Sequence, residues 1–544
     1  MNRYLTIVGA TALAAAAFPV AGAGMACESL AGLSLPDTTI TLAAVVPAGT
    51  FDPPGATPPI AVTACRVTGS IRPTADSDIR FEVWMPVAGW NGKFLSAGEG
   101  GYAGAINYGG INGALVRGYA GGSTDTGHVG GTADFAPGYP EKVTDFGWRA
   151  KHLQAARSKD LIRAFYGAPA RHSYFSSCSN GGRQALHEIQ RFPEDYDGVI
   201  VGAPANNWTH HFAGFVWNEQ ALWNTAGGWM AQSKLQAVQA KTLEQCDALD
   251  GVRDGVAEDP RRCSFDPASL ACAAGTDGPS CLTPAQVSAV RKIRSGPRNP
   301  RTGAQIYPGY FTSAAGEAAS WPAWITGPNV PGGSIQGFFG NAFFGRIVHE
   351  IPAPGVWDFS TFNFDSDMAF ADAKTEHTMN ATETNLSAFT RTNPRGKIIM
   401  WHGWEDPAIS ALDAVDYYEK VVRANEDAKD FFRLFMVPGM LHCGGGPGPN
   451  AFGQNLAQSR PLSNSPEHDV LSALERWVEE GVAPKSIVAV KYVNDNPASG
   501  VQRTRPLCAY PKVAMYKGSG STNDAANFAC RNANWKNGQR DDDD

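Results

Sequence analysis

The chain has 544 residues, of which 43% are hydrophobic and 10% aromatic, so it holds enough apolar material for a large buried core. Its formal net charge is −7 and it carries no basic run, which argues against nucleic-acid binding. Beyond the first residues, no segment reaches the roughly 18 uninterrupted apolar residues of a membrane span, so we expect no membrane partner.

Residues 1–23 have the pattern of a secretory signal peptide. Arg3 supplies a short positive region, residues 5–18 are mostly apolar, and Ala21-Gly22-Ala23 forms an A-x-A cleavage site. We therefore expect a secreted or periplasmic protein. An alternative is a lipoprotein acylated on Cys27, although "GMAC" lacks the usual leucine three residues before the cysteine.

The first half of the mature chain alternates strand and helix patterns. Strands are predicted over 79–86, at the start of 92–104, and over 172–179 and 197–205; helices are predicted over 148–167 and 181–192. This alternation favours a parallel sheet that is covered by helices on both faces.

The alternation stops between residues 206 and 380 and then resumes. The interrupting segment is irregular and holds seven of the fourteen tryptophans. Strands are predicted to begin the segments 396–406 and 431–448, and helices to occupy 411–424 and 467–481. The simplest architecture is one α/β domain, formed by residues 24–205 and 381–544, with residues 206–380 inserted as a separate domain.

The stretch "SSCSNGG" (176–182) lies between a predicted strand and a predicted helix. It matches the nucleophile elbow G-x-S-x-G, with Ser177 in place of the first glycine, and makes Ser179 the candidate nucleophile. The amide of Asn180 would then point at the reacting oxygen. An ordinary tight turn is the alternative interpretation of this stretch alone.

A serine nucleophile needs a base and an acid, which an α/β hydrolase supplies in the chain order Ser, acid, His. Asp406 follows the strand "KIIMWHG" and His442 follows the strand "FRLFMVPG", so both fall at the carboxyl ends of strands. His442 would accept the serine proton and Asp406 would orient the imidazole. His402 and Glu405 compete with Asp406; we expect His402 to be buried and Glu405 to face solvent.

Ten cysteines in an exported chain suggest five disulfides. Local spacing pairs Cys27 with Cys65, Cys246 with Cys263, Cys272 with Cys281, and Cys508 with Cys530, which leaves Cys178 and Cys443 for each other. That last bond would join the residue before the candidate nucleophile to the residue after the candidate base.

The arrangement of Cys178-Ser179, Asp406 and His442-Cys443 is where the chain resembles the tannase and feruloyl esterase family, which includes mono(hydroxyethyl) terephthalate hydrolase. The motifs "CSNGGRQ", "HGWEDPAIS", "FMVPGMLHCGGGPG" and "RTRPLCAYPKVAMYKGSG" carry the resemblance in combination. It implies an α/β-hydrolase fold with a large lid-domain insertion, a secreted serine hydrolase with five disulfides, and a structural calcium ion. It places the nucleophile, acid and base on Ser179, Asp406 and His442.

A second oxyanion donor, beside the Asn180 amide, is expected from the glycine-rich loop "GEGGYAG" (98–104). Gly100 and Gly101 are both candidates. The loop departs from the nucleotide-binding pattern G-x-G-x-x-G at Ala103, so we do not expect a nucleotide site.

The candidate calcium site is the acidic loop "CDALDGVRDGVAEDPRRC" (246–263). Asp247, Asp250 and Asp254 supply hard oxygen ligands within eight residues, and the carbonyls of Val252 and Val256 would complete the shell. On the residues alone, a solvated acidic turn is an equal alternative; the resemblance to the family's lid site favours Ca²⁺.

The aromatic insertion would close over the triad as a lid and suits flat aromatic acyl groups. We therefore expect a secreted esterase that acts on small hydroxycinnamoyl (feruloyl-type) esters, including those on plant cell-wall material. Tannase, terephthalate half-ester hydrolase, a protease and a non-catalytic secreted binding module are the alternatives. Arg346 is a candidate contact for an acidic substrate.

Overall fold

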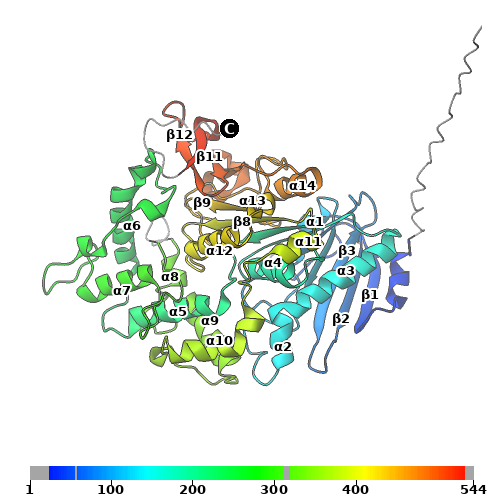
Figure 1. The fold of residues 1–544 in the computed structure, drawn as a ribbon, viewed down its shortest axis with the longest axis horizontal. Helices are drawn as coiled ribbons and strands as arrows, with labels where there is room; N and C mark the ends of the chain where they lie inside the picture. The colour runs from blue at the N-terminus through cyan, green and yellow to red at the C-terminus, as the bar shows by residue number, and fades with distance from the viewer. Residues whose placement is uncertain (1–23, 55–57, 312–318, 533–544) are drawn as a thin grey trace, which may run out of the picture.

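A computed structural model describes residues 24–54, 58–311 and 319–532, and the predicted signal peptide (1–23) lies outside them. Its centre is a nine-stranded sheet with the order β1-β2-β3-β5-β4-β6-β7-β8-β9 (Figure 1). The strands are β1 (Thr38–Val46), β2 (Ala64–Ile71), β3 (Ile79–Pro86), β4 (Lys93–Ala97), β5 (Ala120–Thr124), β6 (His172–Cys178), β7 (Gly198–Gly202), β8 (Lys397–Gly403) and β9 (Phe432–Val437).

The sheet is mixed, whereas the sequence pattern predicted a parallel one. The strands from β5 through β4, β6, β7 and β8 to β9 are parallel. β1, β2 and β3 extend the sheet antiparallel, and β3 also pairs antiparallel with β5. The parallel part is therefore the part that carries the predicted catalytic residues at its carboxyl ends.

Helices cover both faces of the parallel part, as predicted. α3 (Ala150–Tyr166), α4 (Asn180–Arg191) and α12 (Ala411–Ala424) pack on one face, and α1 (Tyr108–Leu115) and α14 (Val470–Glu480) on the other. β7 shows how one strand serves both faces. Val199 and Val201 join the core under α3 and α4, while Ile200 between them joins the core under α14, because successive side chains alternate.

The large insertion separates β7 from β8, although these strands are neighbours in the sheet and pair Gly198 with Lys397. Its helices form a body at one end of the sheet, drawn in green in Figure 1. They are α5 (Trp208–Trp223), α6 (Gln232–Cys246), α7 (Pro284–Ser295), α8 (Trp321–Trp324), α9 (Ile335–Ala342) and α10 (Ser366–Met379). This body, which we call the lid, contributes most of an aromatic-rich core that also includes Tyr102 and Ile409 from outside the insertion.

The remaining elements flank this framework. Two small two-stranded sheets pair β10 (Ser486–Tyr492) with β11 (Val501–Cys508) and β12 (Lys512–Tyr516) with β13 (Phe528–Asn532). The short helices are α2 (Pro140–Thr144), α11 (Ser387–Thr392) and α13 (Ala428–Phe431). Within the described part of the chain, no helix is long and apolar enough to cross a membrane.

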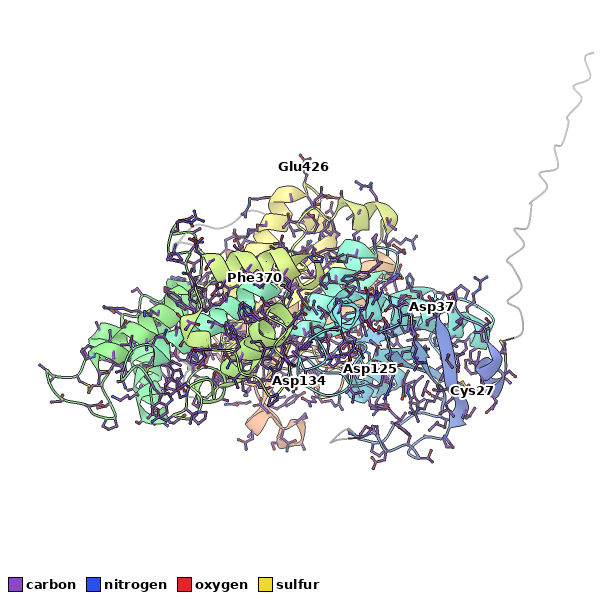
Figure 2. All side chains as sticks on the ribbon, turned by 90° about the horizontal axis from the view of Figure 1, so that it is seen from below. Cys27, Asp37, Asp125, Asp134, Phe370 and Glu426 are labelled. Atoms are coloured by element: carbon purple, nitrogen blue, oxygen red, sulfur yellow. A yellow bond between two sulfur atoms is a disulfide. The ribbon has the colours of Figure 1, made fainter. Side chains whose placement is uncertain are left out.

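All five cysteine pairings predicted from spacing are confirmed. Cys27, labelled in Figure 2, starts a short 3₁₀ helix that packs beside β1 and bonds to Cys65. Its thiol is therefore engaged, which argues against the lipoprotein alternative. Five disulfides are typical of proteins that fold in an oxidising compartment.

Candidate active site

Ser179 lies between β6 and α4 in a strained backbone conformation. Its φ is +67°, which non-glycine residues rarely adopt. Close packing of α4 supports the turn, because a Cβ on Gly182 would lie 2.4 Å from the carbonyl oxygen of Gly202. The Ser179 amide also donates to that carbonyl at 2.9 Å. The stretch is thus the sharp strand-to-helix turn that the sequence predicted.

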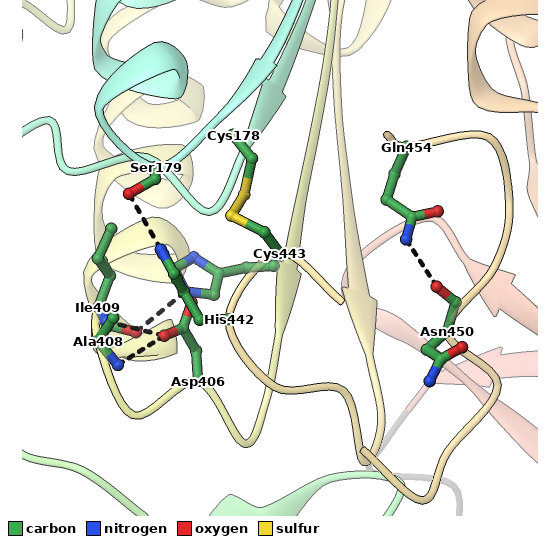
Figure 3. The surroundings of a disulfide bond; sticks show 10 residues. Cys178, Ser179, Asp406, Ala408, Ile409, His442, Cys443, Asn450 and Gln454 are labelled. Atoms are coloured by element: carbon green, nitrogen blue, oxygen red, sulfur yellow. Dashed lines mark hydrogen bonds and ion pairs between the residues drawn. A yellow bond between two sulfur atoms is a disulfide. The ribbon is translucent and has the colours of Figure 1, made fainter. Parts of the chain in front are cut away.

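The three sequence-predicted side chains meet in one hydrogen-bonded chain (Figure 3). Ser179 Oγ lies 3.0 Å from His442 Nε2, and His442 Nδ1 lies 2.8 Å from Asp406 Oδ2. They come from the ends of β6, β8 and β9, which are far apart in sequence and close in the parallel sheet. This is the geometry that general-base activation of a serine requires.

Asp406 is buried and held as a carboxylate. Its Oδ1 accepts hydrogen bonds from the amides of Ala408 and Ile409 at 2.8 and 2.9 Å. Burial alone would raise its pKa, but the neighbouring His442 and hydrogen bonds from His402 and His442 outweigh burial and hold the pKa below its usual range. The carboxylate is therefore available to orient and balance the imidazole.

The two competing residues behave differently from each other. His402 is fully buried, as predicted, and its Nε2 lies 3.2 Å from Asp406 Oδ2 and 3.1 Å from the Ile409 carbonyl oxygen. Glu405 was expected to face solvent, but it is only 5% exposed, so that prediction is wrong. The turn after β8 folds inward against the protein and takes Glu405 with it. Asp406 is the carboxylate that pairs with His442 Nδ1.

The Cys178–Cys443 disulfide ties the nucleophile strand to the histidine loop (Figure 3). The two α-carbons are 6.0 Å apart, inside the range expected from disulfide geometry. Because Cys178 precedes Ser179 and Cys443 follows His442, the bond limits how far the serine and the imidazole can separate.

The candidate oxyanion residues Gly100, Gly101 and Asn180 all line the cavity next to Ser179. The Asn180 side chain donates from Nδ2 to the Gly101 carbonyl at 2.9 Å, which fixes the glycine loop against the start of α4. The Gly100 carbonyl accepts from the Ala103 amide at 3.0 Å. The Gly100 carbonyl and the Gly101 N–H belong to the same peptide group, and in a trans peptide they point in opposite directions. The Gly101 N–H therefore points away from Ala103.

Ser179 lines a cavity of about 390 Å³. The lid contributes an aromatic part of its wall, which consists of Trp208, His211, Phe212, Phe215, Trp324 and Phe339. The hydrolase domain contributes the rest of the wall, which includes Ala97, Gly98, Asn107, Gly110, Ala408, Ile409, Gln454, Asn455 and Leu456. None of the described lining residues is a lysine, an arginine or a carboxylate.

One face of α5 supplies much of the aromatic wall, and no substrate-binding role was predicted for its residues from the sequence. Trp208, His211, Phe212 and Phe215 are spaced i, i+3, i+4 and i+7, the periodicity of a single helix face. That spacing is visible in the sequence, but nothing there shows which body the face meets. From the lid, Trp324 also packs edge-on against His442 with ring centroids 5.3 Å apart.

Arg346 does not reach the cavity, which corrects the suggestion that it meets the substrate. Its Nε pairs with Asp134, labelled in Figure 2, at 2.6 Å, and its Nη1 donates to the carbonyls of Ile351 and Gly355. It lines a separate surface hollow. These contacts join the lid to Asp134 of the hydrolase domain.

The acidic loop between Cys246 and Cys263 forms a second, much smaller cavity of about 10 Å³. Four of the five predicted calcium ligands line it, namely Asp250, Val252, Asp254 and Val256, together with Glu258. Asp247 lies in the same loop, where its Oδ1 accepts from the amides of Asp254 and Gly255. Arg503 and Arg505 pair with Asp254. Its carboxylate oxygens suit a hard cation, although Arg505 and apolar side chains, including Leu507 and Phe528, also line the cavity.

Fold and site together define a class of protein. A strained serine after a central strand lies hydrogen-bonded to a histidine and an aspartate at the ends of later parallel strands, which is the arrangement found in the α/β-hydrolase fold. Comparison with known proteins narrows this class. Residues 65–531 match the family described as "Tannase and feruloyl esterase", and the chain belongs to that family.

Relatives and solved structures agree with this assignment. An uncharacterized esterase of Xanthomonas campestris is 44% identical, over 97% of this chain and 95% of its own. A probable feruloyl esterase B-2 of Aspergillus terreus is 30% identical, over 93% and 94%. The crystal structure of feruloyl esterase B from Aspergillus oryzae superposes with a TM-score of 0.84 at 31% identity, covering 93% of this chain and 99% of that one.

A tannin acyl hydrolase from Aspergillus niger shares the fold, with a TM-score of 0.71 at 22% identity over 91% and 92% of the two chains. The protein is thus a carboxylic ester hydrolase. This sets aside the non-catalytic binding module.

Proposed function

We propose that this protein hydrolyses esters of hydroxycinnamic, feruloyl-type acids through an acyl-enzyme on Ser179. The observation that carries the proposal is the position of Ser179, hydrogen-bonded to His442, at the floor of a cavity with an aromatic lid wall. Flat aromatic rings pack well against such walls. The resemblance to feruloyl esterase B proteins over more than nine-tenths of the chain supports the same acyl class.

The reaction follows from the three side chains. His442 Nε2 takes the Ser179 proton as the oxygen attacks the ester carbonyl, and returns it to the departing alcohol. Water then attacks the acyl-enzyme with His442 again acting as base, which releases the acid and restores the serine. Asp406 keeps the imidazole in the tautomer whose Nε2 accepts a proton.

The negative charge that develops on the ester oxygen needs donors close to Ser179. We assign the Asn180 amide, at the start of α4, and the Gly101 amide, with Gly100 as the alternative second donor. The bond from the Asn180 side chain to the Gly101 carbonyl holds the two candidate donors in one rigid unit.

Among related activities, hydrolysis of galloyl esters is the second candidate, since a tannin acyl hydrolase shares the fold. Hydrolysis of a terephthalate half-ester is disfavoured, because no described lysine or arginine lines the cavity to meet the free carboxylate. A protease would need amide leaving groups, which a comparison of ester and amide analogues tests directly.

The deciding experiment measures ferulate release from methyl ferulate and gallate release from methyl gallate, with Ser179→Ala in parallel. We expect ferulate release that the substitution abolishes. Preference for gallate would move the protein to the tannases. Cleavage of a small aryl acetate alone would keep the triad but assign another acyl group, and equal turnover by Ser179→Ala would refute the nucleophile.

We also propose that the acidic loop holds a structural Ca²⁺ and that residues 1–23 direct export to the periplasm or the exterior. Asp247, Asp250 and Asp254, with the carbonyls of Val252 and Val256, would hold the ion. Because Arg503 and Arg505 already balance Asp254, the charge left for the cation comes mainly from Asp247 and Asp250. The ion would close the lid loop and take no part in the chemistry at Ser179.

A further inference from the structure

His211 is a polar residue in the aromatic wall of the cavity, and the reaction proposed above does not use it. It lies on α5 between Trp208 and Phe215, lines the cavity, and is only 3% exposed. Its ring packs edge-on against Phe215 and Tyr307, with centroids 4.4 and 5.5 Å away. The ring is therefore packed against protein where it meets these two aromatic side chains.

The imidazole lacks hydrogen bonds from the described residues. Its Nδ1 is enclosed and has no partner, and the hydroxyl of the neighbouring Tyr307 is also enclosed and unpaired rather than bonded to it. Nε2 makes no hydrogen bond to any described residue either, yet it is not among the enclosed atoms. Because His211 lines the cavity, Nε2 is the atom that the ring offers to a bound molecule.

The ring stays neutral in the range where esterases work. Burial, followed by the nearby His442 and His402, lowers the pKa of His211 to about 3, although Asp406 acts in the opposite direction. A neutral imidazole does not attract a carboxylate as a cation would. It is a good partner for a group that both donates and accepts a hydrogen bond.

We propose that His211 recognises the phenolic hydroxyl of the acyl group, and thereby selects hydroxycinnamoyl over unsubstituted cinnamoyl esters. This inference rests on the proposed function and adds a specificity-determining residue to it. A buried polar atom without a hydrogen-bonding partner costs free energy. A substrate whose hydroxyl supplies that partner gains affinity, whereas a substrate without the hydroxyl leaves the atom unpaired.

A hydroxyl fits this position better than other ring substituents. The phenol can donate to Nε2 in one imidazole tautomer and accept from Nε2–H in the other, so it suits either. A methoxy group can only accept, and a bare ring edge can do neither. The flanking rings of Trp208, Phe212 and Phe215 leave the substrate ring an apolar surface to pack on.

The test compares kcat/KM for the methyl esters of 4-hydroxycinnamate, 4-methoxycinnamate and cinnamate. In the wild-type enzyme we expect the hydroxy ester to exceed cinnamate by roughly tenfold or more. In His211→Phe the ratio should fall to about one, because the hydroxy ester loses its hydrogen-bonding partner. The ratio should not change between pH 5 and 8, since the ring does not titrate there.

His210→Phe is the matched control. This neighbouring histidine turns away from the cavity, with Nδ1 2.9 Å from the Ile306 carbonyl and Nε2 3.0 Å from Asp372. Its loss should leave the hydroxyl ratio unchanged. If thermal unfolding shows that His211→Phe does not fold, His211→Gln is the second variant. It keeps a hydrogen-bonding side chain, so its ratio should be reduced but should stay above one.

The outcomes separate this inference from the proposed function. A wild-type ratio near one, or a full ratio in a folded His211→Phe enzyme, overturns the role of His211 while leaving Ser179-dependent ester hydrolysis intact. Failure of the wild-type enzyme on all three esters, with turnover of a galloyl ester instead, overturns the proposed acyl class itself.

Discussion

At the scale of single residues, Ser179 combines a strained backbone with close support from the surrounding structure. Its positive φ is an unfavourable conformation for a residue with a Cβ, and only the surrounding structure maintains it. The hydrogen bond from the Ser179 amide to the Gly202 carbonyl and the close approach of Gly182 to the same carbonyl supply that support. The hydroxyl is thereby presented to the cavity without a conformational change that a substrate would have to induce.

Asp413, at the start of α12, gives a pH-dependent prediction. Burial, followed by repulsion from Asp416, raises its pKa to about 7, above the usual value near 3.9 in an unfolded chain. Between about pH 4 and 7 the folded state keeps a proton that the unfolded state releases, so stability falls as the pH rises. Asp413→Asn should remove this loss of stability. The melting temperature of the variant relative to that of the wild type should therefore rise from pH 5 to pH 8.

The control is Glu426→Gln, because Glu426 lies just after α12 and is exposed, whereas Asp416 itself contributes to the raised pKa of Asp413. Chemical or thermal unfolding at several pH values measures both variants. An Asp413→Asn difference that is constant with pH would contradict the raised pKa.

Residues next to recognisable strand ends were predictable from sequence. Ser179, Asp406 and His442 each follow a strand whose apolar pattern stands out, and their flanking cysteines reinforce the pairing. The burial of Glu405 and His211 was not predictable, since it depends on how the turn after β8 and one face of α5 pack against other parts of the fold. A charged or polar side chain gives no local signal of such a contact.

At the scale of elements, β5 shows where local propensity fails. Its sequence "AGGST" reads as a loop, yet all five residues are buried in the sheet. A Cβ on Gly122 would lie 2.5 Å from Gln154 Nε2, and one on Gly121 would lie 3.3 Å from Ala114 Cβ. The glycines are there because helices pack tightly on both faces, a tertiary requirement that a propensity scale does not contain.

The acidic loop gives a prediction about metal removal. If the loop holds the proposed Ca²⁺, its verified removal should lower the melting temperature, because Asp247 and Asp250 would then lack a cation to balance their charge. Asp250→Asn should lower it similarly and respond no further to a chelator. Ester hydrolysis measured well below the transition should be retained.

Asp259→Asn serves as the matched control, because Asp259 lies in the same disulfide-closed loop but pairs with Arg261 at 2.8 Å. It should keep the response to the chelator. An unchanged melting curve after metal analysis confirms that the ion has been removed would count against the assignment of the loop.

At the scale of the whole molecule, the Cys178–Cys443 bond spans 265 residues and crosses the entire lid insertion. Replacing both cysteines by alanine should cost stability, about 5 kcal/mol in the chain-entropy estimate. It should also lower kcat in the folded enzyme, because the separation of Ser179 and His442 is less constrained.

The Cys508→Ala, Cys530→Ala pair is the comparison, since that bond spans only 22 residues and joins β11 to β13, away from the cavity. It should cost stability without lowering kcat. Full kcat in a folded enzyme that lacks Cys178 and Cys443 would show that the bond does not position the triad.

The adjacency of β7 and β8 also determines when the enzyme can assemble. During synthesis β7 emerges long before its partner strand, because the whole lid is made between Gly198 and Lys397. Until then its outer edge offers unpaired backbone groups to other chains, and contacts this distant in sequence form slowly. An incomplete chain can therefore neither finish the sheet nor bring Asp406 and His442 to Ser179, so ester hydrolysis begins only once nearly all of the protein has been made.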